Sequence, residues 1–225
     1  MENFSQLLIS GICYCLLFLL CFFVWQMKSE NLLSLIVQNG NWFLLHLRHA
    51  GGVVIMVLIP LFFIHEFPLE VLTWPENVRG SQTLVLAITA IMLFIVSLKD
   101  SLRIKNKAIV TENWSAFHAI LHVLFRSTFL VSYEWFFRGV LLFGCISVFG
   151  LPAAIIINMV LYAAIHSFNG RKEFLCSIPF GLTLCAFTIW WHSVWPAILL
   201  HLLLSTACES MILRHFFYKH SKLIL

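Results

Sequence analysis

An acidic and a basic residue stand inside one of the most apolar regions of the chain. Glu134 and Arg138 belong to the stretch 132–139, and apolar residues 125–131 and 140–149 flank it on either side. On a helix, side chains four positions apart share a face and can form an ion pair. Ionisable groups at membrane depth are costly and by default mark a functional site. The pair is therefore either part of a chemical site or an internal ion pair that only fixes helix packing.

Two histidines and a serine recur in later apolar segments. His166 ends one such segment, and Tyr162 lies one turn before it. His201 lies within another, and Ser205 follows one turn later on the same face. A single histidine in a membrane segment is more often a hydrogen-bonded packing residue. Several such groups all need burial away from lipid, however, and a shared polar cavity would bury them together.

Such a cavity could support two kinds of chemistry. A carboxylate and two imidazoles can activate a water molecule as general base and stabilise a developing oxyanion. The same groups can also ligate a metal ion. The chain lacks Gly-x-Ser-x-Gly and His-Glu-x-x-His motifs. Asp100 is its only aspartate, which excludes a paired-aspartate protease.

The composition is that of a polytopic membrane protein. Hydrophobic residues make up 61% of the 225 residues and charged residues 11%, with a mean hydropathy of +0.94. No polar stretch is long enough to fold separately, so we expect one integral membrane domain over residues 1–225. The net charge of +4 is modest, and the Lys and Arg residues lie near the ends of apolar segments. We therefore expect the lipid bilayer, and no nucleic acid, as a partner.

Seven apolar segments are long enough to cross a bilayer. They are 7–25, 42–64, 83–98, 114–149, 152–166, 174–191 and 194–213. The segment 114–149 exceeds a single crossing, and it would give eight spans if it folded back on itself. With seven spans, the basic loop 99–107, the basic pair 171–172 and the basic tail all fall on one side, as the positive-inside rule requires. We therefore predict an all-α bundle of seven spans around a buried polar cavity, with a cytoplasmic C-terminus.

Three further regions receive simpler interpretations. Residues 28–41 mix leucines with polar side chains and predict an interfacial helix. Residues 66–80 predict a polar loop. His118, His122 and Arg126 follow helical spacing, and we expect an interfacial polar stripe there in preference to a metal site.

Three motifs, taken in order, resemble the CPBP family of type II CAAX prenyl endopeptidases and bacteriocin-processing or self-immunity proteins. That family carries Glu-Glu-x-x-x-Arg, Phe-x-x-x-His and His-x-x-x-Asn/Asp on successive helices. The corresponding stretches read YEWFFR at 133–138, YAAIH at 162–166 and HLLLS at 201–205. The resemblance covers about residues 132–206 as a catalytic core, and it is strongest to short bacterial members. It therefore implies a protein of the bacterial cytoplasmic membrane.

The resemblance implies an intramembrane endopeptidase that hydrolyses a peptide bond in a membrane-associated or lipid-modified peptide or protein. Glu134 and His166 would activate the water molecule. His201 would stabilise the oxyanion, and Arg138 would orient Glu134. Ser205 stands at the Asn/Asp position of the oxyanion hole, where its hydroxyl can still donate a hydrogen bond.

Two departures from the family pattern leave a second function open. Tyr133 replaces the first glutamate of the family, and Ser205 replaces the Asn/Asp. A catalytically inactive member would act as a membrane peptide-binding or bacteriocin self-immunity protein. A small transporter has less support, because no broken-helix repeat is visible. We expect a metal-independent site without a cofactor; if zinc were bound, its ligands would be His166, His201 and Glu134.

Overall fold

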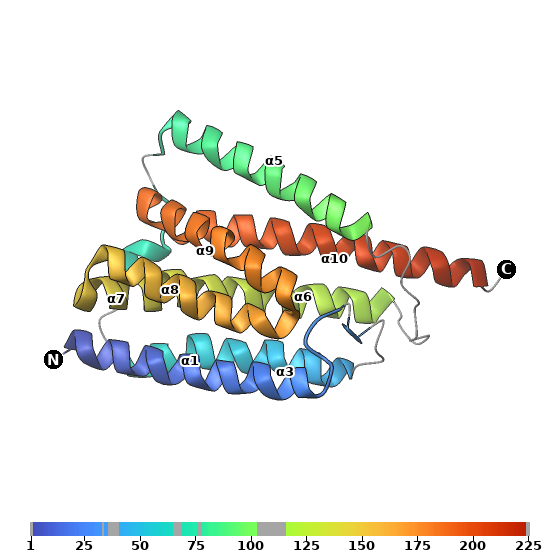
Figure 1. The fold of residues 1–225 in the computed structure, drawn as a ribbon, viewed down its shortest axis with the longest axis horizontal. Coiled ribbons are helices and arrows are strands. Elements are labelled where there is room, and N and C mark those ends of the chain that lie inside the picture. Colours follow the sequence, from blue (N-terminus) through green and yellow to red (C-terminus); the bar gives the residue numbers. More distant parts are fainter. Residues whose placement is uncertain are drawn as a thin grey trace.

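The protein is a bundle of long helices (Figure 1). The computed structural model describes residues 2–32, 34–35, 41–64, 69–75, 78–102 and 116–223. In these residues seven helical segments are long and apolar enough to cross a membrane, and none of the described residues forms a strand. The predicted all-α bundle of seven spans is therefore confirmed.

The helical elements follow the predicted spans in chain order. They are α1 (Glu2–Gln26), α3 (Trp42–Val53), η1 (Val54–Leu58), α4 (Ile59–Phe63), η2 (Leu69–Leu72), α5 (Gly80–Leu102), α6 (Ala116–Glu134), η3 (Trp135–Leu141), α7 (Leu142–Phe149), α8 (Leu151–His166), η4 (Ser167–Asn169), α9 (Arg171–Trp191) and α10 (Trp195–Leu223). Parts of the predicted interfacial helix at 28–41, of the loop at 66–80 and of the basic loop at 99–107 lie outside the described residues.

The central helix of the bundle carries the first motif. Elements α6, η3 and α7 form one continuous span, Phe117–Phe149, which is the most buried of the seven. The chain does not fold back here, which rules out eight spans. The π-helical segment η3 begins directly after Glu134. Single π-helical turns inside α-helices are frequent at functional sites.

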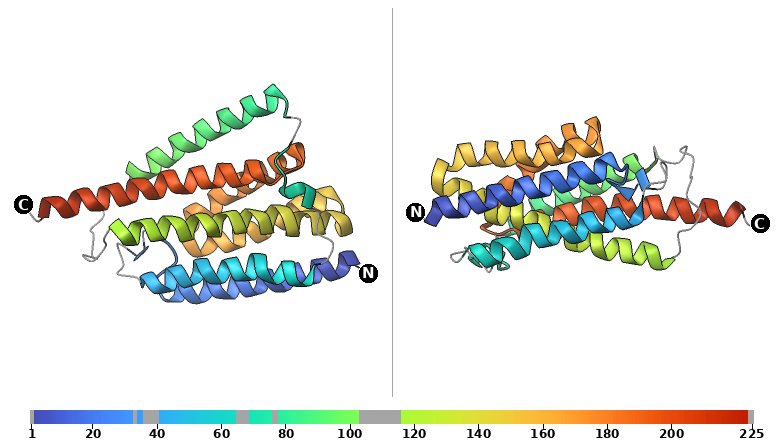
Figure 2. Two further views of the ribbon diagram at one scale, coloured as in Figure 1. Left: turned by 180° about the vertical axis from the view of Figure 1, so that it is seen from behind. Right: turned by 90° about the horizontal axis from the view of Figure 1, so that it is seen from below.

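The other helices surround this central span. Helix α6 packs against α3 on one side and against α10 on another, while α8 packs between α7 and α9. Helix α1 lies along α3, and α5, the least buried span, packs against α10 (Figures 1 and 2). The two termini lie at opposite ends of the bundle. Helices distant in sequence therefore meet on the central span.

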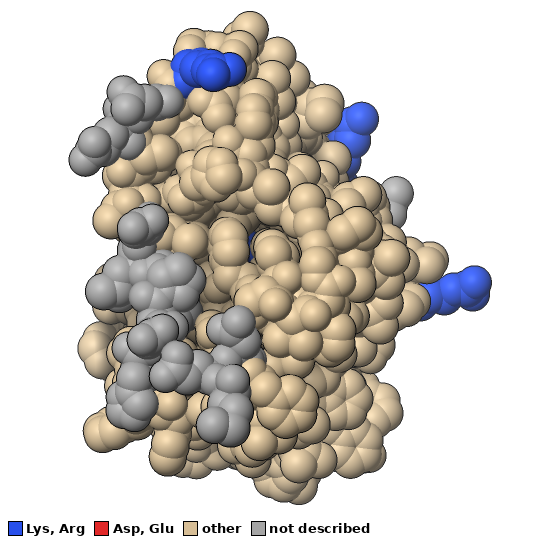
Figure 3. Space-filling model, turned by 90° about the vertical axis from the view of Figure 1, so that its left-hand side faces the viewer, with Lys and Arg blue, Asp and Glu red and all other residues tan. Residues whose placement is uncertain are grey.

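Positively charged helix ends gather at one end of the bundle. Asp100, near the end of α5, forms an ion pair with Lys172 at the start of α9. The C-terminal end of α10 extends from the same end of the bundle (Figure 1). Lys and Arg are sparse among the described residues visible at the opposite end (Figure 3). This distribution agrees with the seven-span topology, and the cytoplasmic placement of this end stays a prediction.

The segment before α5 holds the start of the last helix in place. The backbone N–H of Val194 donates to the carbonyl of Val71 at 3.0 Å. The hydroxyl of Ser193 donates to the carbonyl of Thr73 at 2.9 Å. His192 ends α9 in the left-handed conformation, with φ of 48°. These bonds fix the direction in which α10 enters the bundle, and with it the position of His201 on α10.

Helix α3 lies close to the central span at Gly52. A Cβ atom on Gly52 would lie 2.5 Å from Cε2 of Phe129 on α6. We expect Gly52→Ala to lower the free energy of unfolding by roughly 1–3 kcal/mol, as overpacked cores do, and to lower the Tm in detergent. In the control Gly11→Ala, on α1, the new methyl group has no neighbour within 4 Å, so the Tm should not fall. A wild-type Tm for Gly52→Ala would contradict this close packing.

Candidate active site

Glu134 lies at the centre of a buried polar group. The side chains of Glu134 and Arg138 are both 0% exposed, and Nε of Arg138 lies 3.4 Å from Oε2 of Glu134. The other carboxylate oxygen, Oε1, accepts a hydrogen bond from Nδ1 of His201 on α10. One carboxylate therefore joins three of the predicted site residues across two helices. The predicted ion pair of Glu134 with Arg138 is present.

The guanidinium of Arg138 makes further contacts with two other helices. Its Cζ atom lies 4.3 Å from the ring centroid of Tyr162 on α8, which is a cation–π geometry. Its Nη2 donates to the carbonyl of Gly181 on α9 at 3.4 Å. A Cβ atom at Gly181 would lie 3.1 Å from the Tyr162 ring. Arg138 therefore connects the central span to α8 and α9 at a point where a side chain on α9 would crowd it.

His166 is held in one tautomer by the backbone. Its Nδ1 lies 2.8 Å from the carbonyl oxygen of Tyr162. Because a carbonyl oxygen only accepts hydrogen bonds, Nδ1 carries the proton and Nε2 of the neutral ring keeps a free lone pair. The ring centroids of His166 and His201 lie 6.4 Å apart. His166 thus presents an available base close to the second histidine.

Tyr133 occupies the position of the first glutamate of the family. It is 2% exposed, and its ring centroid lies 6.0 Å from the ring centroids of both His166 and His201. Its hydroxyl oxygen makes no hydrogen bond within the described part of the chain. Where the family has a second carboxylate, this protein has an aromatic ring that lies beside both imidazoles.

The predicted polar cavity is present next to these rings. Its volume is about 480 Å³, and His166 and His201 both line it. Most of the other lining residues belong to α3, α5, α6, α9 and α10, and residues 30–32 and Asn169 complete the lining. Glu134 does not line the cavity, and it is joined to the lining by its hydrogen bond to His201. The two histidines and Ser205 are therefore the motif residues placed to meet a ligand in the cavity.

Ser205 lines the same cavity but belongs to a second polar cluster. Its Oγ accepts a hydrogen bond from Nε of Arg126 at 3.2 Å. Arg126 also forms an ion pair with Glu209 at 3.2 Å, and Nε2 of His122 lies 3.1 Å from the other Glu209 oxygen. The predicted interfacial stripe is wrong for His122, which is 1% exposed. Burial is tolerated there because Glu209, on a helix far along the chain, supplies the compensating carboxylate.

Sequence reasoning did not identify three of the residues that line this cavity. Glu209 stands near the end of the last span, and Arg48 and His49 interrupt the second. The available signal was the occurrence of ionisable residues within apolar segments. Its meaning depended on packing partners that the sequence alone did not show.

The zinc ligand set considered from the sequence does not converge in this structure. One Glu134 oxygen accepts from Nδ1 of His201, and Nδ1 of His166 is bonded to a backbone carbonyl. In the described ranges of the chain, no group of three or more His, Cys, Asp or Glu residues is arranged to hold a metal ion.

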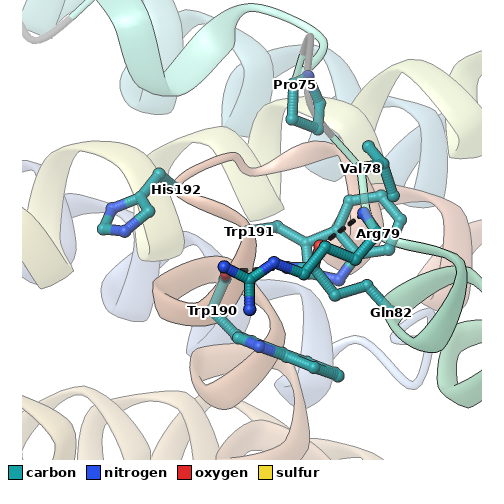
Figure 4. Close-up of a pocket in the computed structure, with 7 residues that line it drawn as sticks. All are labelled: Pro75, Val78, Arg79, Gln82, Trp190, Trp191 and His192. Carbon is teal, nitrogen blue, oxygen red and sulfur yellow. Dashed lines mark hydrogen bonds between the residues drawn. The ribbon is translucent and has the colours of Figure 1, made fainter.

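A second hollow lies between the start of α5 and the end of α9 (Figure 4). Its volume is about 290 Å³, and it is lined by Pro75, Val78, Arg79, Gln82, Trp190, Trp191 and His192. The backbone N–H of Arg79 donates to Oε1 of Gln82 at 2.9 Å. This hollow contains none of the motif residues. The chemistry suggested by the sequence therefore belongs to the larger cavity.

The fold and the site define an integral membrane protein with a buried Glu–Arg–His group beside a polar cavity. Residues 113–207 match the family model described as type II CAAX prenyl endopeptidase Rce1-like. The matched range includes all three motifs, which confirms the resemblance to the CPBP family. This is a protease family, so the match supports a hydrolase. No curated protein and no solved structure matches the chain.

The buried ion pair predicts a strong coupling between its partners. We expect Arg138→Met to lower the free energy of unfolding by roughly 3–5 kcal/mol, because it leaves the Glu134 carboxylate buried without its cation. Adding Glu134→Gln should recover part of this loss. A double-mutant cycle, measured by unfolding in mixed micelles with circular dichroism, gives the coupling energy. Additive effects of the two substitutions would contradict the pair.

A matched control breaks an exposed ion pair in the same protein. The side chains of Lys172 and Asp100 are 51% and 35% exposed. Lys172→Met should change the free energy of unfolding by less than about 1 kcal/mol, because solvent screens surface pairs.

Proposed function

We propose that the protein is an intramembrane endopeptidase of the CAAX-protease type. Its substrate would be a membrane-associated or lipid-modified peptide or protein, and its single membrane domain would span residues 1–225. The observation that carries this proposal is the presence of His166 and His201 on one polar cavity, with buried Glu134 bonded to His201. The family match over the same residues supports it.

The geometry supports a general-base hydrolysis. Nε2 of His166 takes a proton from a water molecule as the water oxygen attacks the peptide carbonyl carbon. His201, in its doubly protonated form paired with Glu134, donates from Nε2 to the developing oxyanion. The hydroxyl of Ser205, one turn away, is a second donor for that oxygen. When the intermediate collapses, the imidazolium of His166 returns its proton to the leaving amine.

In this proposal Glu134 acts through His201. Its carboxylate fixes the orientation of the imidazole and stabilises its charged form, as a carboxylate does in hydrolytic triads. Arg138 holds the carboxylate in place from the opposite side. Glu134 is then a positioning residue, and the direct contact with water that the family resemblance implies for it stays a separate prediction.

We also place the protein in the bacterial cytoplasmic membrane, with its C-terminus in the cytoplasm. The positive-inside rule supports this orientation, because the basic ends of α5, α9 and α10 lie together. Asp100 and Lys172, at that end of the bundle, both line the polar cavity. A substrate would therefore enter the site from the cytoplasmic side.

Tyr133 favours a second candidate function. With one carboxylate instead of two beside the imidazoles, the cavity could bind a peptide without hydrolysing it. The protein would then act in peptide binding or bacteriocin self-immunity.

Cleavage of a quenched fluorescent peptide library separates these two functions. Purified protein is tested on prenylated and unmodified versions of the library. We expect wild type to cleave, and His166→Ala and His201→Ala each to lower the rate by about 10²–10⁴-fold, because each removes a group that handles a proton or the oxyanion. The control His192→Asn removes an exposed histidine outside the cavity and should keep wild-type activity. Folded but inert wild type on every substrate class would contradict the protease and favour the binding protein.

The role of Glu134 can be tested by separating kcat from KM. We expect Glu134→Gln to lower kcat by roughly 10²-fold or more and to leave KM within about twofold, because the amide still orients His201 but cannot stabilise its charge. Glu134→Asp keeps the charge and should recover part of kcat. A rise in KM at unchanged kcat would contradict the positioning role.

A further inference from the structure

Arg48 is a buried cation in the wall of the cavity. It is 3% exposed, and its Nη1 donates to the backbone carbonyl of Glu30. Its Cζ atom lies 5.8 Å from the ring centroid of Phe129. Its Nε has no hydrogen-bond partner, and no carboxylate of the described residues forms an ion pair with it. A buried guanidinium in this state is only partly compensated.

The other two arginines beside the site are compensated differently. Arg138 is paired with Glu134, and Arg126 is paired with Glu209. Because breaking a buried pair leaves a costly uncompensated charge, these arginines are committed to their partners. Arg48 differs from both, since it lines the cavity and no carboxylate of the described residues is paired with it.

His49, the next residue along α3, adds a second polar side chain to the same wall. It is 1% exposed and lines the cavity, and its Nδ1 has no hydrogen-bond partner in the described part of the chain. Glu30 also lines the cavity, and its Oε2 has no partner. Glu30 is therefore the internal competitor for Arg48, although the two side chains are not paired in the structure.

The Arg48 side of the cavity lies near the proposed catalytic histidines. The Cζ atoms of Arg48 and Arg126 each lie 5.8 Å from the ring centroid of Phe129, so the two guanidiniums contact the same ring. Arg126 also bonds to Ser205, which lies one helical turn, about 6 Å, from His201. Arg48 is thus linked to His201 through Arg126 and Ser205, and an extended hexapeptide reaches about 20 Å at about 3.3–3.6 Å per residue. One short peptide segment could therefore contact both parts of the cavity.

We propose that Arg48 and His49 form a carboxylate-binding subsite for the substrate. One arginine and one neutral histidine match a singly charged anion, because Arg forms paired N–H···O bonds with carboxylates and no further free cation was found beside it among the described residues. The carboxylate is either the free C-terminus of the substrate or an Asp or Glu side chain near the cleaved bond. This proposal rests on the proposed function, since it assigns the substrate class of the same cavity.

Peptide binding tests the subsite without requiring cleavage. The probe is a fluorescein-labelled library of apolar hexapeptides in three forms: free C-terminal carboxylate, C-terminal amide, and C-terminal amide with one internal Glu. Anisotropy is measured on His166→Ala protein in nanodiscs, with empty nanodiscs as the partition blank. We expect at least one carboxylate form to bind tenfold or more tightly than the plain amide. The form that does so identifies the source of the carboxylate.

Substitutions then assign the preference to Arg48. Arg48→Gln should reduce the difference between acid and amide forms to within twofold, and Arg48→Lys, which keeps the charge, should retain most of it. Arg171→Gln removes an exposed cation at the start of α9 and should retain the full difference. Equal loss in Arg171→Gln would show general electrostatic attraction and overturn the subsite.

If the Arg48 variants fail to fold, binding to the His166→Ala protein, in which Arg48 is intact, still decides the proposal. Equal or undetectable binding of all three library forms would overturn the subsite and leave Glu30 as the effective partner of Arg48. Carboxylate-selective binding without cleavage by wild type would keep the subsite and refute the protease. Cleavage without carboxylate selectivity would refute the subsite alone.

Discussion

The buried ion pair of Glu134 and Arg138 is the constraint on which the rest of the site depends. Neither charge is accessible, so each must be compensated inside the bundle. Glu134 is compensated by Arg138 and by His201 of α10, while Arg138 also contacts Tyr162 of α8 and Gly181 of α9. Compensating two charges therefore requires four helices to meet at one level. Because His166 lies one turn after Tyr162 on α8, the contact of Arg138 with Tyr162 also places His166 beside the cavity.

The cavity combines elements from inside and outside the family match. The histidines and Ser205 lie within residues 113–207, whereas Arg48 and His49 belong to α3, outside that range. The matched region supplies the groups proposed for hydrolysis. The outer helices supply polar groups that could select a substrate. Such a division allows a family to keep one reaction and vary its substrates, because recognition is then carried by other helices.

The two departures from the family pattern have different structural contexts. Tyr133 places an aromatic ring beside both imidazoles where the family has a carboxylate, so Glu134 is the one motif carboxylate. Ser205 is tied to Arg126, which also pairs with Glu209 and so belongs to a second network. The first departure changes the chemistry directly beside the histidines. The second departure, Ser205, connects the predicted oxyanion position to the ion pair of Arg126 with Glu209.

The sequence by itself favoured seven spans over eight and predicted the pairing of Glu134 with Arg138. Both follow from local rules, since the bilayer fixes the length of a span and helical spacing fixes which neighbours share a face. The family motif also located His166 and His201, and the cost of burying them predicted a shared cavity. Tertiary structure alone decided that His201 is the histidine bonded to the carboxylate, and that Glu209 compensates the polar residues of α6. These contacts join helices far apart in the chain, and their geometry is set by side-chain packing that no local pattern encodes.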